Sequence, residues 1–183
     1  RFIRAALVIS RKTDHKEERM KLNRLKNELL SSIEDVCMTP SDIAMDPVRD
    51  FTRTRKLPLF EVVRCTVVMG GSSMKHELLD ILGYSPDTAT SSAFIQQRAK
   101  LKPEALKKVL DSFNGRCGKF RKKEDLRILA VDGSDIQIPT NPEDADTFFP
   151  GSNGQTPYNL LHLNAMYDLD NRIYTDIRFS RNE

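Results

Sequence analysis

The sequence of 183 residues predicts an α+β protein, with helices in residues 1–125 and antiparallel strands in residues 126–183. In the first region, apolar residues recur every three or four positions, and serine, proline and glycine mark helix starts and ends. In the second region, short apolar runs rich in β-branched residues are separated by a proline-rich loop and a turn. These patterns place the expected domain boundary between residues 125 and 126.

The first predicted helix covers residues 14–36. Leucine, isoleucine and valine recur there at spacings that put them on one face of a helix. The stripe consists of Leu22, Leu25, Leu29, Ile33 and Val36. Basic residues lie mainly off this stripe, where a solvent-exposed face explains them better than DNA contact. Pro40 and Pro47 then break the chain into a loop with short helical turns.

Two further helices are expected in the middle of the basic region. Residues 58–69 are predicted to form a buried helix opened by a proline, with a strand as the alternative because of the valines. Ser72 or Ser73 is expected to cap a helix over residues 74–82, which Gly83 ends.

Two more helices complete the predicted helical region. Ser91 or Ser92 is expected to cap a helix over residues 93–101. The last helix is predicted over residues 104–113, closed by the pair at 114–115. Short helices joined by capped turns are compatible with a helix-turn-helix, although the connection before the first of these two helices is longer than the usual tight turn.

Charge is unevenly distributed along the chain. Residues 1–125 hold 25 Lys and Arg against 17 Asp and Glu, whereas residues 126–183 hold 4 against 9. A basic front and an acidic back suggest a nucleic-acid-binding part joined to a part whose carboxylates have another role. Two solvated faces of opposite sign remain the simpler alternative.

The densest basic stretch is residues 91–125, with 10 Lys and Arg against 4 Asp and Glu. Glutamine and arginine read base edges or phosphates, and a lysine-rich run binds phosphates through counterion release. The residues predicted to contact DNA are Gln96, Gln97, Arg98, Lys100, Lys102, Arg121, Lys122 and Lys123. A smaller group, Arg53, Arg55 and Lys56, either contacts phosphates or forms a charged connector. For any single lysine, a solvated helix surface or linker is the alternative.

The apolar run at residues 126–131 is typical of a strand buried on both faces. Asp132 is expected to end this strand, and Gly133 to let the chain turn. A carboxylate held at the end of a central strand is well placed for metal binding or catalysis. Asp-Gly-Ser is also an ordinary turn sequence, in which the aspartate bonds to nearby backbone amides.

Two more strands are predicted, over residues 160–167 and 172–179, after a loop at 139–157 that is too rich in proline and glycine for a regular element. The result is a three-stranded antiparallel meander. His162 and Asn164 share a face of the second strand, as structural polar groups or as site residues. On the third strand, one face is expected to carry Ile173, Thr175, Ile177 and Phe179, and the other Tyr174, Asp176 and Arg178.

Several classes of protein and site are excluded by the sequence. No apolar stretch approaches the ~18 residues that span a bilayer, and the apolar core of residues 1–10 is too short for a signal peptide. Cys37, Cys65 and Cys117 form no CxxC pair, which favours reduced thiols in a cytoplasmic protein over a zinc site or a disulfide framework. The acidic residues at 143–146 lack the later ligands of a calcium loop.

Four segments together resemble bacterial insertion-sequence transposases of the IS-four group. The segments are SAFIQQR at 92–98, LAVDGS at 129–134, NGQ at 153–155 and YNLLHLNAMYD at 158–168. The resemblance covers about residues 50–183 and is most specific over 126–177. It implies an RNase-H-like catalytic domain, which begins with a three-stranded antiparallel meander and carries an Asp-Asp-Glu triad.

Asp132 matches the first aspartate of that triad, whereas Asp135, Asp168 and Asp176 do not. The resemblance places the second aspartate and the glutamate beyond the fourth strand, so they are absent from this chain, and Glu183 comes too early to be that glutamate. The 183 residues are therefore expected to be the front part of a transposase that does not catalyse alone.

The implied reaction is DNA cleavage and strand transfer. Two Mg²⁺ ions (or Mn²⁺) would activate the nucleophile and stabilise the leaving oxygen, with Asp132 as a ligand. The implied partners are duplex DNA at the transposon ends and target, and a second copy of the chain in a homodimer on DNA, within the bacterial nucleoid. A non-enzymatic DNA-binding protein and a nuclease of the same fold are the alternatives.

Overall fold

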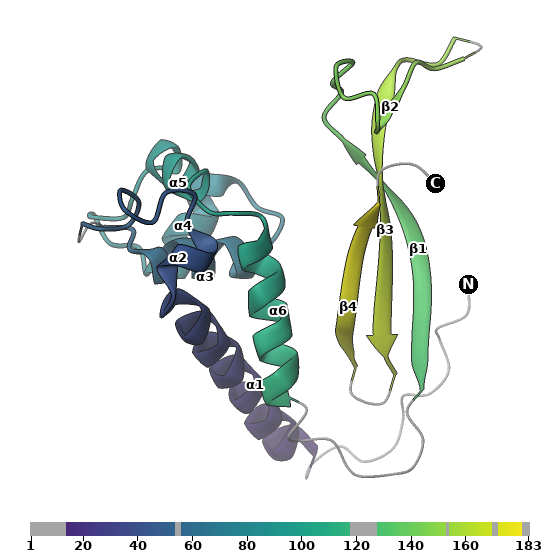
Figure 1. The fold of residues 1–183 in the computed structure, drawn as a ribbon. Coiled ribbons are helices and arrows are strands. Elements are labelled where there is room, and N and C mark those ends of the chain that lie inside the picture. Colours follow the sequence, from purple (N-terminus) through teal and green to yellow (C-terminus); the bar gives the residue numbers. More distant parts are fainter. Residues whose placement is uncertain (1–13, 54–55, 118–127, 153, 170–171, 181–183) are drawn as a thin grey trace. The chain divides into compact units, whose positions relative to one another are not determined.

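A computed structural model describes residues 14–53, 56–117, 128–152, 154–169 and 172–180 (Figure 1). The chain divides into two compact units, Arg1–Lys119 and Phe120–Glu183. The described part of the first unit contains six helices, and that of the second contains four strands in one antiparallel sheet. The predicted α+β class is confirmed. None of the helices in the described ranges combines the length and apolarity needed to cross a membrane.

Two long helices pack against each other in the first unit. These are α1, Asp14–Cys37, and α6, Glu104–Cys117. Arg116 joins them: its guanidinium lies 2.6 Å from the Asp35 carboxylate and 3.4 Å from that of Glu28. The prediction of α1 is confirmed almost to the residue. The predicted end of α6 at residue 113 is wrong, because the helix continues through Asn114 and Gly115 and ends at Cys117.

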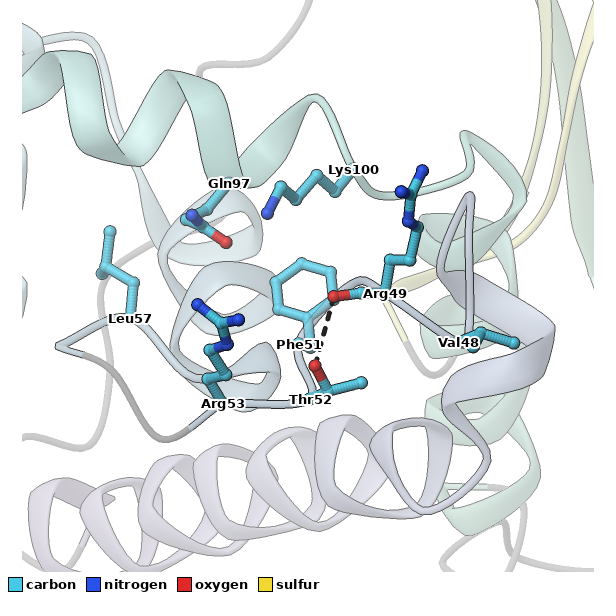
Figure 2. Close-up of a pocket in the computed structure, with 8 residues that line it drawn as sticks. All are labelled: Val48, Arg49, Phe51, Thr52, Arg53, Leu57, Gln97 and Lys100. Atoms are coloured by element: carbon cyan, nitrogen blue, oxygen red, sulfur yellow. Dashed lines mark hydrogen bonds between the residues drawn. The ribbon is translucent and has the colours of Figure 1, made fainter.

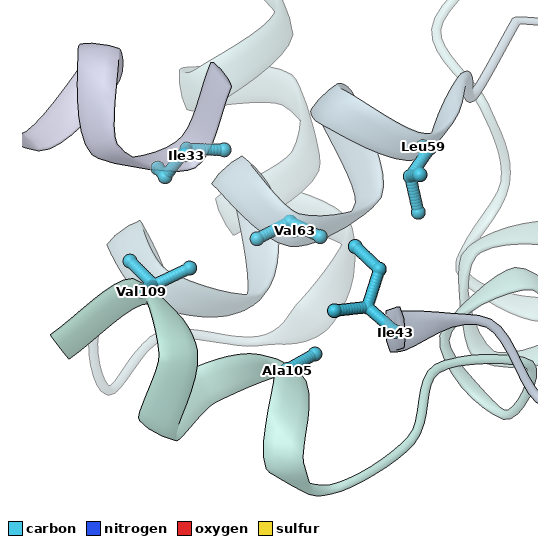
Figure 3. Close-up of a cluster of buried hydrophobic side chains, with 6 residues drawn as sticks. All are labelled: Ile33, Ile43, Leu59, Val63, Ala105 and Val109. Atoms are coloured by element: carbon cyan, nitrogen blue, oxygen red, sulfur yellow. The ribbon is translucent and has the colours of Figure 1, made fainter. Parts of the chain in front are cut away.

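Helix α3, Leu59–Val68, lies between two apolar clusters, with α2, Pro40–Ile43, beside one of them. The first cluster is formed by Ile33, Ile43, Leu59, Val63, Ala105 and Val109 (Figure 3). The second is formed by Leu57, Val62, Cys65, Leu78 and Phe94. Helix α3 contributes to both clusters, and its valines lie in the predicted helix rather than in the alternative strand.

Helix α4, Met74–Leu82, begins without a side-chain cap from Ser73. The Glu77 carboxylate accepts hydrogen bonds from the backbone N–H groups of Gly70 and Ser72 instead, at 3.0 and 2.8 Å. Gly83 ends the helix in a left-handed conformation, with φ +83°, as predicted.

Helix α5, Ser91–Arg98, begins two residues earlier and ends three residues earlier than the predicted helix over residues 93–101. Neither of the expected serines is its N-cap. Thr90 has this role, because its side-chain oxygen accepts a hydrogen bond from the N–H of Ala93 at 3.2 Å.

The sheet has β3, Tyr158–Asp168, at its centre, paired with β1, Leu129–Ile138, on one side and β4, Ile173–Ser180, on the other. All pairs are antiparallel, so the predicted three-stranded meander is confirmed (Figure 1). The prediction of no regular element in 139–157 is wrong, because β2, Phe148–Phe149, also pairs with β3.

Asn159 explains how this long loop reaches the sheet. Its side chain is buried and donates to Thr147 Oγ1 at 2.8 Å and to the Asn141 carbonyl at 3.1 Å. Its Oδ1 accepts the Asn141 N–H at 2.8 Å. These bonds satisfy the buried amide of Asn159. They also hold the loop against β3 at two positions, Asn141 and Thr147.

Strand β1 differs from the prediction in two respects. It is exposed over nearly its whole length, because no helix covers it in the described part of the second unit. It also does not end at Asp132: the strand continues through Gly133 to Ile138, paired with β3 throughout. The predicted turn is therefore wrong.

A register shift in β4 changes the predicted faces of that strand. Opposite Met166 and Tyr167, the ladder moves by one residue, so that Tyr174 pairs with Tyr167. The two rings meet edge to face at 5.0 Å between centroids. Tyr174 therefore shares the face of Ile177 and Phe179, and Ile173 lies on the other, because a bulge interrupts the alternation.

Candidate functional site

Asp132 lies in the body of β1, opposite Ala165 on β3. Its side chain is exposed, and Oδ1 accepts the N–H of Gly133 at 3.0 Å. Directly paired residues share a face, so Asp132 faces the same side as Ala165 and Ile177. Most residues on this face are apolar: Ile136, Leu161, Leu163, Tyr167, Tyr174 and Phe179. The pairing ladders on both sides of β3 thus fix the face of the sheet on which the Asp132 side chain lies.

The opposite face of the sheet explains the glycine that follows Asp132. Asp135 and His162 are paired across β1 and β3, with Oδ1 and Nδ1 at 2.8 Å. A Cβ at Gly133 would lie only 3.0 Å from His162 Nε2 and 3.4 Å from Asn164 Oδ1. Close approach of these side chains therefore favours glycine, rather than a turn.

The metal site implied by the family resemblance is incomplete in the residues that the structure covers. No three His, Cys, Asp or Glu side chains gather there in a metal-binding group. Asp132 supplies a hard oxygen donor of the type that Mg²⁺ prefers, but Mg²⁺ needs further oxygen ligands at near-octahedral positions. The described residues fit the first ligand of such a site and do not hold an ion by themselves.

The predicted DNA contacts separate into distinct environments. Gln97 and Lys100 line one polar pocket. Gln96 is exposed and lies 3.4 Å from Ser92 Oγ, while Arg98 lies 5.8 Å above the Phe94 ring centroid.

Lys102 has a structural contact, because its ammonium donates to the Ser41 carbonyl at 3.0 Å. The remaining predicted contacts, Arg121, Lys122 and Lys123, lie outside the described residues. Of the five predicted DNA contacts that lie in the described residues, the structure therefore brings two, Gln97 and Lys100, into one site.

A pocket among the described residues of the first unit has a volume of about 360 Å³. It is formed by the segment before α3 and by the end of α5 with the turn after it. Figure 2 shows Arg53 and Lys100 reaching toward the space beside the Phe51 ring. The lining residues are Val48, Arg49, Phe51, Thr52, Arg53, Leu57, Gln97 and Lys100.

Backbone bonds hold the two walls of the pocket together. The Met45 N–H donates to the Lys100 carbonyl at 2.8 Å, and the Lys102 N–H donates to the Ile43 carbonyl at 2.8 Å. Phe51 packs against both apolar clusters. Its backbone φ is +58°, a value that residues other than glycine rarely adopt. Such strain persists only where the surrounding structure enforces it, and the packing of Phe51 against both clusters holds this side of the pocket.

The pocket carries an excess of positive charge. Lys100 Nζ lies 3.6 Å from Asp50 Oδ1 and 6.0 Å from the Phe51 ring centroid. Among the described residues, no carboxylate forms an ion pair with Arg49 or Arg53. Three cations against one carboxylate, on partly closed walls, favour an anionic ligand.

Arg49 was not predicted as a site residue, and Arg53 was predicted only as one of two alternatives. The available signal was a cluster of cations between Pro47 and the buried helix. Sequence spacing alone does not show that this segment meets Gln97, nearly fifty positions later.

Comparison of the chain with family models, with curated proteins and with solved structures gave no match in any of the three.

Proposed function

We propose that this chain is the DNA-handling front part of a transposase with an Asp-Asp-Glu triad. The observation that carries the proposal is the position of Asp132, exposed on the first strand of an antiparallel meander and directed by a continuous ladder. This placement keeps Asp132 on the first strand, as the resemblance implies, although the strand continues beyond it to Ile138. The division into a basic helical unit and a strand unit supports separate tasks for the two.

In this proposal the helical unit binds duplex DNA at the transposon ends, largely through phosphates. The strand unit supplies Asp132 as one oxygen ligand. Bound Mg²⁺ or Mn²⁺ would supply the charge that activates a nucleophile and stabilises a leaving oxygen. Further carboxylates must complete that site, since Asp132 alone provides one.

A non-enzymatic DNA-binding protein is the second candidate. The observation that favours it is the cationic pocket of the first unit. A nuclease of the same fold is distinguished from a transposase by its products, because a nuclease releases cut ends and does not join them.

The test compares Asp132→Asn with Asp135→Asn in the complete gene product that contains this sequence. The two aspartates are three positions apart on β1 and face opposite sides of the sheet, so they form a matched pair. We expect Asp132→Asn to lower cleavage of transposon-end DNA by about a thousandfold or more with Mg²⁺, and Asp135→Asn to retain most of it. Equal activity of Asp132→Asn and wild type would refute the assigned role.

A further inference from the structure

We propose that the pocket lined by Val48, Arg49, Phe51, Thr52, Arg53, Leu57, Gln97 and Lys100 is a binding site for a phosphate group. The inference rests on the proposed function for the source of the phosphate, which is the backbone of duplex DNA. Arg53 and Lys100, which reach toward the space beside Phe51 in Figure 2, are then the principal ligands, with Arg49 and Gln97 as further donors.

The two arginines provide the main argument. Each lines the pocket, and neither has an ion-pair partner in the described part of the chain. A guanidinium offers paired N–H donors in a plane that matches two phosphate oxygens. Arginines that line a pocket without an ion-pair partner among the described residues are available to bind an anion rather than to stabilise the fold.

The other polar groups fit the same ligand. Lys100 adds a third cation, while Asp50, at 3.6 Å from its ammonium, offsets part of the charge. The Gln97 amide adds a neutral N–H donor. Thr52 Oγ1 donates to the Arg49 carbonyl at 3.2 Å, which orders the backbone beneath the arginine. The pocket therefore combines charge with neutral hydrogen-bonding groups.

The position of the pocket favours a phosphate that belongs to a polymer. Its volume of about 360 Å³ is large enough for a phosphate group. Gln96 and Arg98 are exposed on the adjoining turn of α5. A strand with one phosphate in the pocket therefore passes near side chains that can contact the next nucleotides.

The experiment measures duplex DNA binding by the 183-residue chain between about 50 and 200 mM salt, using fluorescence anisotropy. The test variants are Arg53→Gln and Arg49→Gln. Lys107→Gln is the matched control, because Lys107 lies on α6, is exposed and does not line the pocket. Each change removes one positive charge, and thermal unfolding checks that each variant folds.

We expect Arg53→Gln to weaken binding about fivefold to tenfold at low salt and to reduce the slope of log affinity against log salt by about 0.9. Lys107→Gln should change the affinity for DNA less than twofold, which is about the smallest difference that the measurement distinguishes. Equal effects of Arg53→Gln and Lys107→Gln would overturn the proposal. If Arg53→Gln does not fold, Arg49→Gln provides the same comparison.

A second arm separates this inference from the proposed function. Inorganic phosphate is titrated into the wild-type chain, with chloride at equal ionic strength as the control, and backbone amide shifts are followed by NMR. Shifts confined to 51–53 and 97–100 that are lost in Arg53→Gln support the pocket even if the chain binds no DNA, in which case the DNA source is wrong. Absence of both DNA and phosphate binding overturns the pocket as well.

Discussion

Gly133 shows how a neighbouring side chain can select glycine without a turn. The His162 ring, held by Asp135, occupies the space that a Cβ at position 133 needs. Local sequence gave the opposite interpretation, because Asp-Gly-Ser is common in turns. The pairing with β3 that keeps the backbone extended involves residues some thirty positions later, which no local pattern contains.

The contact at Gly133 leads to a prediction for a double-mutant cycle. In the wild-type background, Gly133→Ala should destabilise the fold, because the His162 ring must move. In a His162→Ala background the same change should stabilise it by about 0.5 kcal/mol, because alanine reduces the entropy of the unfolded chain. Urea unfolding should give a coupling of about 1 kcal/mol, and additive effects would contradict the assigned contact.

Cys37 provides a second prediction for a single residue. Burial raises the pKa of its thiol from the ordinary 9.0 to about 11. At pH 8 the folded chain should therefore alkylate at Cys37 about a hundredfold more slowly than the urea-unfolded chain, since only the thiolate reacts. Peptide-resolved mass spectrometry with iodoacetamide measures the two rates. Similar rates would contradict the burial of this thiol.

The same pKa shift has a consequence for stability. Because the folded state holds the proton more tightly than the unfolded state, the contribution of Cys37 is fully present below about pH 9. It is lost as pH rises toward about 11, the pKa in the folded chain.

Helix α1 was predictable because the information that defines it is local. Its apolar stripe follows the helical period, and Ile33 is fully buried in the first cluster. The same stripe does not show how far the core extends along the helix: Leu22 is 62% exposed. Burial along α1 depends on where α3 and α6 pack, which is a tertiary property.

This difference along one helix gives a prediction at the scale of the element. Ile33→Ala should cost about 2–5 kcal/mol in the free energy of unfolding, because it leaves a cavity among packed side chains. Leu22→Ala, on the same stripe, should stay within about 0.5 kcal/mol of wild type. Urea unfolding followed by circular dichroism measures both. Comparable losses would show that the N-terminal half of α1 is also covered.

Helix ends and short strands were harder to predict than helices. Thr90, Ser91 and Ser92 are all good N-cap residues. Thr90 is the N-cap because its backbone is extended and its side chain accepts the N–H of Ala93. The strand β2 consists of two residues in a segment with many prolines, and exists because Asn159 and Thr147 bond at its edge. Such elements depend on specific partners rather than on periodicity.

For the whole molecule, the division into Arg1–Lys119 and Phe120–Glu183 predicts separable activities. A chain of residues 1–119 should fold and bind duplex DNA with a salt slope within about one unit of that of the 183-residue chain, because the pocket lies entirely within it. Anisotropy titration of both chains tests this. If log affinity of the shorter chain does not change with log salt, the phosphate contacts lie outside residues 1–119.

The candidate site was predictable only in part at this scale. Gln97 and Lys100 were found from their residue types and the basic stretch around them. Arg49 was not, because its position beside them results from the pairing of residues 43–45 with 100–102. Asp132 was found from the resemblance and its apolar approach, but its place within the strand comes from the ladder with β3.

The most direct test of the account is whether the 183-residue chain binds duplex DNA electrostatically. We predict a dissociation constant of about 1–100 μM at moderate salt, with log affinity falling linearly as log salt rises. The contradictory result is an unchanged anisotropy of labelled duplex DNA at about 50 mM salt with protein at about 100 μM.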